Sequence, residues 1–146
     1  MQHTARESFK LIDFEYPLSI AKLAYNSGAR SIALVSAVGA QEGSFNYYFH
    51  IKGKLENEIR KIGYENICFA RPGHLLGARK DFRGYEIPVL ESGLKIAAPF
   101  MQGPLKNFRQ IEARHVAERM VMDLLNKHKG ISYLYYEDFL KTETFE

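Results

Sequence analysis

Apolar residues recur at helical spacing in several parts of the chain, and each part is bounded by residues that start or stop helices. The pattern predicts a first helix capped by Asp13, running to Ala24 and stopping by Gly28. A second helix is expected from Phe45 to Ile62, ending at Gly63. The strongest helical stripe spans Glu112–Lys127 before Gly130, and a weaker one spans Glu91–Phe100.

Short apolar runs between these helices predict strands. Ile32–Val35 and Asn66–Ala70 are continuous runs, which are typical of strands covered on both faces. The turn Pro72-Gly73 stops the second run because proline cannot donate a ladder hydrogen bond. Ile131–Tyr136 alternates as a strand does, and a short helix is expected from Asp138.

Helices and strands therefore alternate along residues 1–146, and this order predicts one α/β domain with a parallel sheet and flanking helices. A chain of 146 residues with 46% hydrophobic residues can bury a real core. We find no internal repeat or linker that would divide it.

Composition excludes several classes of function. The formal charge is +3, with basic residues spread among acidic ones, so we expect no nucleic-acid face. No stretch is long enough to span a membrane, and the polar N-terminus is unlike a secretory signal, which predicts a cytoplasmic protein. Cys68 is the only cysteine and lies in an apolar run, so we expect a buried, inert thiol. Scattered histidines predict no metal site.

Tyr48 and Lys52 are the candidate chemistry of the second helix. Residues four apart share a helix face, so Lys52 is expected to lower the pKa of the Tyr48 phenol and to reach a nucleotide ribose. This spacing favours an oxidoreductase site. The alternative is a packed tyrosine with a backbone partner beside a solvated lysine.

Four other patterns have a structural interpretation that competes with a functional one. His115 is a candidate for a hydrogen-bonded core histidine, and His50 for a surface residue. The cluster Arg79-Lys80-x-x-Arg83 would attract a phosphate or form a solvated loop. Tyr133-x-Tyr135-Tyr136 is interpreted as an edge strand rather than a base-stacking surface, because acidic residues follow it.

Several motifs together resemble a known family. They are Ile12-Asp13-x-x-Tyr16-Pro17-Leu18, Val35-Ser36-Ala37-Val38-Gly39-Ala40, Tyr48-x-x-x-Lys52-Gly53-x-Leu55-Glu56, Phe69-Ala70-Arg71-Pro72-Gly73 and Ile111-Glu112-Ala113-Arg114-His115. Nearly the whole chain is covered. In these motifs the sequence resembles the short-chain dehydrogenase/reductases, and among them the atypical branch of Tat-interacting-protein-like oxidoreductases.

The resemblance implies the C-terminal portion of a Rossmann-like domain and an NAD(P)(H)-dependent oxidoreductase acting on a small carbonyl or alcohol. Tyr48 would exchange the proton, Lys52 would hold the ribose, and Ser36 would polarise a substrate carbonyl. The turn of Pro72 and Gly73 would lie near the nicotinamide, with His74 as a further cofactor contact or a plain loop residue.

Two departures from the family pattern matter. Ala37 stands where family members often have a second serine. The chain also lacks a G-x-G-x-x-G turn and the N-terminal strands that carry it, so the implied cofactor, NADP or NAD, would lack the pyrophosphate site that this turn provides. An incomplete sheet would expose a strand edge, which predicts a homo-oligomer or a protein partner that covers it. The alternative function is therefore a non-catalytic interaction or regulatory module.

Overall fold

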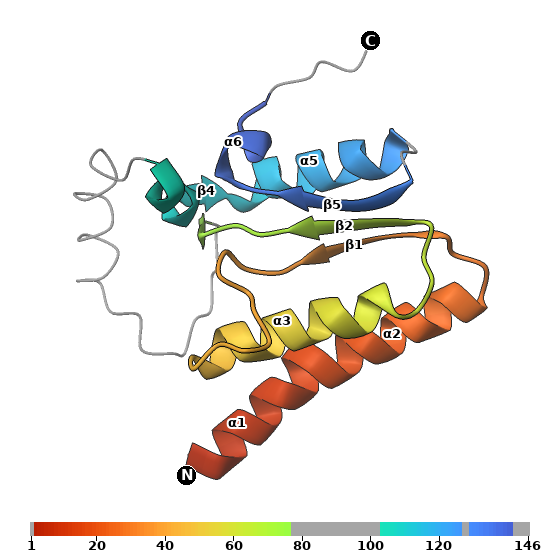
Figure 1. The fold of residues 1–146 in the computed structure, drawn as a ribbon, viewed down its shortest axis with the longest axis vertical. Helices are drawn as coiled ribbons and strands as arrows, with labels where there is room; N and C mark the ends of the chain where they lie inside the picture. The colour runs from red at the N-terminus through yellow and green to blue at the C-terminus, as the bar shows by residue number, and fades with distance from the viewer. Residues whose placement is uncertain (1, 77–102, 127–128, 142–146) are drawn as a thin grey trace.

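The computed structural model describes residues 2–76, 103–126 and 129–141, and shows a parallel sheet between two layers of helices (Figure 1). The sheet contains β1 (Ser31–Val35), β2 (Asn66–Ala70) and β5 (Gly130–Leu134) in the order β1-β2-β5, with both pairs parallel. The predicted α/β class with a parallel sheet and flanking helices is confirmed.

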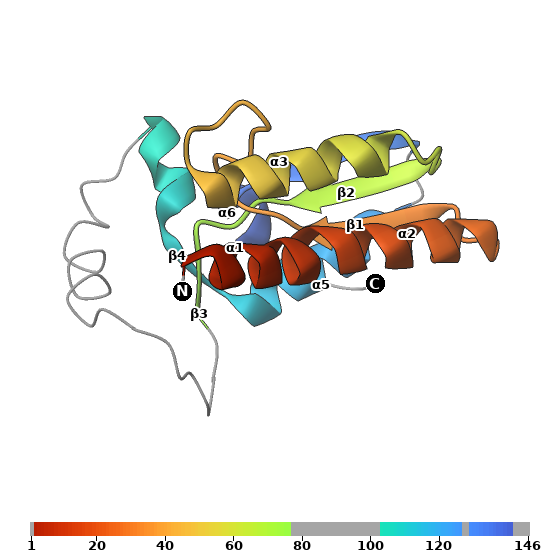
Figure 2. The same cartoon turned by 90° about the horizontal axis from the view of Figure 1, so that it is seen from below.

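The N-terminal helix is longer than the sequence pattern predicts. It consists of α1 (Gln2–Lys10), the π-helical turn η1 (Leu11–Glu15) and α2 (Tyr16–Asn26), which form one rod (Figure 2). The prediction that Asp13 caps this helix is wrong, because Asp13 lies inside η1 and its carboxylate pairs with Lys52. The π turn places Phe14 in the core.

The other large helices cover opposite faces of the sheet. The helix α3 (Tyr47–Arg60) lies with α2 on one face, and α5 (Ala113–Leu125) lies on the other (Figure 1). Both helices lie within the predicted segments, and each of their ends is within two residues of the predicted bound.

His115 is exposed on α5, so its prediction as a core residue is wrong. The neighbouring Val116, at 2% exposure, takes the inward position.

The central strand β2 divides the core into two clusters. Its side chains alternate between faces, so Ile67 and Phe69 pack against α3 while Cys68 and Ala70 pack on the side of α5. All five residues of β2 are buried. This continuous burial explains why residues 67–70 of the strand are apolar.

A second, small parallel sheet escapes the sequence pattern. It pairs β3 (His74–Leu76) with β4 (Gln110–Glu112), and the short helix η3 (Gly103–Phe108) precedes β4. Three-residue strands are too short to show periodicity. The predicted helix Glu91–Phe100 and the basic cluster at 79–83 lie outside the described residues.

The C-terminal strand is shorter than predicted. Residues 130–134 form β5, and α6 (Tyr136–Phe139) begins two residues before the expected Asp138. The amide of Tyr135 donates to the Asp138 carboxylate at 3.0 Å, which caps α6 and takes Tyr135 and Tyr136 out of the strand. Tyr133 does lie on the edge strand β5, as predicted.

In the part of the chain that is described, no helix is both long and apolar enough to cross a bilayer.

Candidate functional site

The loop after β1 and the start of α3 position the candidate residues. Asn46 caps α3, and its side-chain oxygen accepts from the amides of Tyr48 at 2.9 Å and Phe49 at 3.4 Å. Gly53 lets the loop lie directly on the helix, because a Cβ there would stand 2.4 Å from the Gln41 and Glu42 backbone. The first turns of α3 are therefore held at the carboxyl end of the sheet.

Tyr48 and Lys52 share one face of α3, as their spacing predicts. The Tyr48 ring packs against Phe9 and Phe49, with ring centroids 5.7 and 5.4 Å away, and Tyr48 remains 40% exposed. The Lys52 ammonium lies 5.8 Å from the Tyr48 ring centroid. The lysine is mostly buried, with 13% of its side chain exposed, so it is not the solvated residue of the alternative interpretation.

Asp13 changes the electrostatics of this pair. The Lys52 ammonium donates to Asp13 Oδ1 at 2.7 Å, which joins α3 to η1. Burial raises the pKa of Tyr48, and the nearby Asp13 charge raises it further. The prediction that Lys52 lowers this pKa is therefore wrong in this structure, because the lysine is paired with a carboxylate that repels a phenolate.

Ser36 lies directly after β1, at the same end of the sheet as the start of α3. It is 3% exposed, and its amide donates to Ala70 O at 2.7 Å. Its hydroxyl oxygen is buried and has no hydrogen-bond partner among the described residues. A buried hydroxyl without a partner is costly, so the Ser36 hydroxyl is available to donate a hydrogen bond to a ligand at this end of the sheet.

The other expected cofactor residues serve local packing. Pro72 is buried, and its carbonyl accepts from the amide of Val38 at 3.0 Å. A Cβ on Gly73 would stand 2.6 Å from the Phe108 backbone, so the chain itself fills the space over this glycine. His74 is exposed at the start of β3 rather than in a loop.

These residues fit only one end of a dinucleotide. Lys52 and Tyr48 are suited to a ribose hydroxyl and a reacting carbonyl. A pyrophosphate normally binds the free amides at a helix N-terminus. In α3 those amides are engaged by the Asn46 side chain. The N-terminus of α3 is therefore not a free phosphate cradle.

A buried ion pair behind the candidate site was missed by sequence reasoning. Glu56 is 1% exposed, and Arg71 donates to both of its carboxylate oxygens, at 3.0 and 2.6 Å. Arg71 also donates to the Tyr135 hydroxyl at 3.0 Å. Burial alone would lower the pKa of Arg71, but the hydrogen bonds that Arg71 donates to Glu56 and the negative charge of Glu56 outweigh burial and raise this pKa.

This pair ties α3 to the ends of β2 and β5. Arg71 stands 4.7 Å over the Tyr133 ring, and Arg60 donates to the Tyr133 hydroxyl. The sequence gives little signal that Glu56 is buried and paired with Arg71, because an acidic residue within a helix is usually solvated. The pair fixes the height of α3 over the sheet, and thereby the position of Tyr48 and Lys52.

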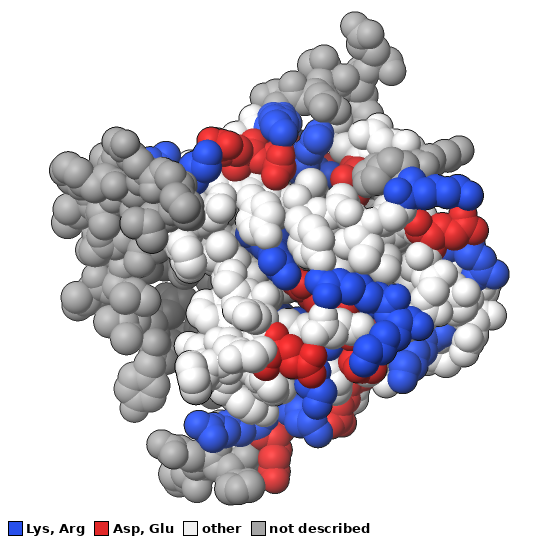
Figure 3. Space-filling model, viewed as in Figure 1, with Lys and Arg blue, Asp and Glu red and all other residues white. Residues whose placement is uncertain are grey.

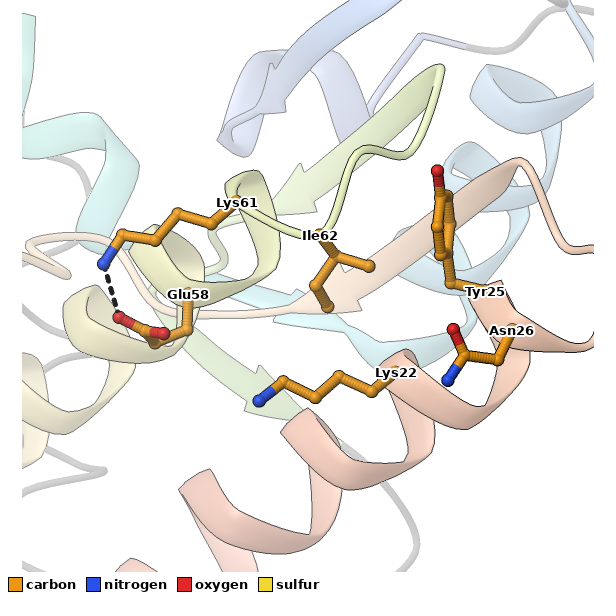
Figure 4. A pocket seen from close by; sticks show the side chains of 6 residues that line it. All are labelled: Lys22, Tyr25, Asn26, Glu58, Lys61 and Ile62. Atoms are coloured by element: carbon orange, nitrogen blue, oxygen red, sulfur yellow. Dashed lines mark hydrogen bonds and ion pairs between the residues drawn. The ribbon is translucent and has the colours of Figure 1, made fainter.

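A surface groove lies at the opposite end of the molecule. Its volume is about 390 Å³, and it is lined by residues from α2, α3 and the turn after α3: Lys22, Tyr25, Asn26, Glu58, Lys61 and Ile62 (Figure 4). Lys61 pairs with Glu58 at 2.6 Å across its wall. Ligands of open parallel sheets bind at the carboxyl ends of the strands, so this groove is separate from the candidate site.

Charges on the visible face are mixed. Figure 3 shows basic and acidic side chains side by side on this face, and on α3 and the turn after it Lys61 pairs with Glu58 at 2.6 Å. Such interleaving gives no broad positive surface on this face.

The fold and the site define a parallel α/β protein with a half-buried Tyr48 and Lys52 at the carboxyl end of its sheet. No protein-family model matches the chain. Curated relatives are named "Protein FMP52, mitochondrial". The relative from Candida albicans is 38% identical over 101 residues, which cover 68% of this chain and 44% of the relative.

Two further relatives carry the same name. The protein from Debaryomyces hansenii is 41% identical over 78 residues, covering 53% of this chain and 34% of the relative. The protein from Candida glabrata is 26% identical over 145 residues, covering 83% and 62%. The chain thus spans less than two thirds of the length of each of these relatives.

The comparisons correct two predictions. The assignment to the short-chain dehydrogenase/reductases is wrong on these findings, because no family model matches and the relatives are named FMP52. The cytoplasmic prediction is also corrected, since the relatives' names place those proteins in mitochondria.

Proposed function

We propose that this chain carries the proton-transfer residues of a mitochondrial oxidoreductase that uses NAD or NADP and reduces a small carbonyl compound. The observation that carries the proposal is the half-buried Tyr48 with the Lys52 ammonium beside its ring. The compartment is proposed from the names of the relatives.

The protonation state of Tyr48 favours the direction of reduction. Burial and Asp13 raise the pKa of Tyr48, so its phenol is protonated at neutral pH. A protonated phenol is an acid that can donate to the oxygen of a carbonyl while its carbon is reduced. The cofactor, when bound, supplies the hydride. The proton lost from Tyr48 is then replaced from solvent, which its partial exposure allows.

Lys52 and Ser36 would support this transfer. When a ribose hydroxyl takes the place of Asp13 as the partner of Lys52, the ammonium becomes available to stabilise the phenolate that remains after proton donation. The unpartnered Ser36 hydroxyl would donate a second hydrogen bond to the carbonyl oxygen. The phosphate cradle would come from a part of the protein other than the N-terminus of α3.

The test combines cofactor binding with turnover. We expect calorimetric titration of the 146-residue protein with NADPH and NADH to show binding to at least one of them, and a panel of small aldehydes and ketones to be reduced. Tyr48→Phe should abolish reduction, while cofactor binding and the unfolding midpoint stay unchanged. Tyr47→Phe is the matched control, because the Tyr47 hydroxyl only donates to the Arg6 carbonyl at 3.3 Å. Full activity of Tyr48→Phe would refute the proposal.

A second candidate function is a non-catalytic module that associates with other proteins. The Lys52–Asp13 ion pair favours this function, because it occupies the ammonium that catalysis requires. The outer edge of β1 favours it as well, since no strand pairs with that edge among the described residues. A folded protein that binds neither cofactor but forms a stable complex would support this function over the enzyme.

A further inference from the structure

The N-terminal rod contacts both reactive residues of the candidate site. The Phe9 ring, at the end of α1, packs against the Tyr48 ring with the ring centroids 5.7 Å apart. The Asp13 carboxylate, in η1, accepts from the Lys52 ammonium at 2.7 Å. Residues 9–13 of the rod therefore lie on the phenol ring and occupy the ammonium at the same time.

Tyr47 provides a second contact between α1 and the start of α3. The Arg6 guanidinium lies 5.3 Å from the Tyr47 ring centroid, and the Phe9 ring centroid lies 6.0 Å from it. Figure 1 shows α1 next to the first turns of α3. A phenylalanine at position 47 keeps both of these ring contacts, so the control Tyr47→Phe leaves α1 in place.

The contacts of α1 with the fold are weaker than those of α2. Residues 5–8 are exposed, and Phe9 is only partly buried. In η1 and α2, by contrast, Phe14 and Ala21 lie in the core, at 9% and 1% exposure. Segments with few buried apolar contacts open at a low cost in free energy. The first part of the rod is therefore the part that can leave the fold while α2 stays in place.

The π turn lies at the boundary between these two parts. It spans Leu11–Glu15, and π turns are among the points at which helices bend sharply. Asp13 lies within this turn, directly before the buried Phe14. A bend at the turn would therefore move the Asp13 carboxylate away from Lys52 together with α1.

We propose that residues 6–13, which we call the clasp, form an autoinhibitory contact that keeps the cofactor from Tyr48 and Lys52, and that the clasp opens at the π turn when the cofactor binds. The inference rests on the proposed function, because it concerns access to the same two residues. The Lys52 side chain is 13% exposed while Asp13 holds it, so little of the ammonium is accessible to a ribose in the closed state.

Cofactor binding and opening of the clasp are then linked. A cofactor that binds only the open state shifts the population toward that state, and a variant that opens the clasp tightens cofactor binding in return. If the clasp of the parent protein is open about a tenth of the time, its removal lowers the apparent dissociation constant about tenfold. A purely structural role for Phe9 predicts the opposite sign, because a damaged site binds more weakly.

The test is calorimetric titration of the 146-residue protein and three variants with NADPH and NADH. We expect Phe9→Ala to lower the dissociation constant about tenfold, and Asp13→Asn to lower it in the same direction by weakening the hold on Lys52. Ile12→Ala is the matched control, because Ile12 lies between these two residues and is 60% exposed, so it should bind as the parent does. The urea midpoints show that each variant is folded.

Amide hydrogen exchange measures the clasp directly. We expect exchange of residues 6–13 to become faster when the parent protein is saturated with cofactor, and to be faster in Phe9→Ala without cofactor. Binding only by the two opened variants would support the clasp. Binding by the parent that neither variant tightens would overturn the clasp and leave the proposed function standing. The absence of binding in all four proteins would overturn the proposed function and the clasp with it.

Discussion

Lys52 and Asp13 form an ion pair at 2.7 Å that joins the start of α3 to the π turn of the N-terminal rod. The pair is partly buried, and 39 residues separate its members in the sequence. It places a carboxylate near the phenol of Tyr48 and occupies the ammonium that would otherwise lower the pKa of that phenol.

We expect Asp13→Asn to lower the pKa of Tyr48 relative to the parent protein. The substitution removes the negative charge that raises this pKa, although burial still raises it. The measurement is an NMR titration of isotope-labelled tyrosines, with Tyr48→Phe used to assign the signal. Glu15→Gln is the control, because Asp13 is the charge that acts on Tyr48. An unchanged pKa in Asp13→Asn would show that the two groups do not interact.

Glu56→Gln should destabilise the fold by about 3–5 kcal/mol, since it leaves Arg71 buried without its anionic partner. Urea unfolding followed by circular dichroism measures the free energy. Glu58→Gln removes a carboxylate two residues away whose ion pair is with the exposed Lys61, and it should have little effect. Equal effects of the two substitutions would contradict the structural role of the Glu56–Arg71 pair.

Gly53→Ala should destabilise the protein by about 1–3 kcal/mol, because the added methyl group would meet the loop backbone at 2.4 Å. Gly43→Ala lies in the same loop with nothing within 4 Å of its Cβ, so we expect almost no change there. The urea midpoints of the two variants provide the comparison. If Gly53→Ala is as stable as the parent, the loop does not lie on α3 as described.

Cys68 should resist alkylation at pH 8 until the protein unfolds. Burial, aided by the Asp123 charge, raises the pKa of its thiol to about 12. In the unfolded chain a cysteine has a pKa of about 8.5. The unfolded state therefore loses this proton first, and the thiol's contribution to stability is present below pH 8.5 and falls as the pH rises above it.

The pH effect is measured as the urea midpoint between neutral pH and pH 10. Cys68→Ala is the comparison, since its stability should fall less steeply over the alkaline part of this range although the cavity lowers its baseline. Rapid labelling of the folded parent protein would contradict the burial of the thiol.

Much of the fold can be predicted from the sequence because the signals are local. The apolar runs at 32–35 and 66–70 predict β1 and β2, and the helical stripes predict the positions of α3 and α5. Helix bounds are less predictable: Asn46 rather than an earlier residue caps α3, and the rod begins at Gln2 instead of near Asp13. Three-residue strands such as β3 carry no periodic signal at all.

The sequence by itself determined the α/β class, the central apolar strand and the shared helix face of Tyr48 and Lys52, since these follow from residues within one or two turns of each other. Only the tertiary structure decided that Asp13 pairs with Lys52 and that Arg71 meets Glu56, because these contacts join residues 39 and 15 positions apart. The charge state of Tyr48 depends on such contacts. For that reason the spacing of Tyr48 and Lys52 predicted the pair correctly and the direction of the pKa shift wrongly.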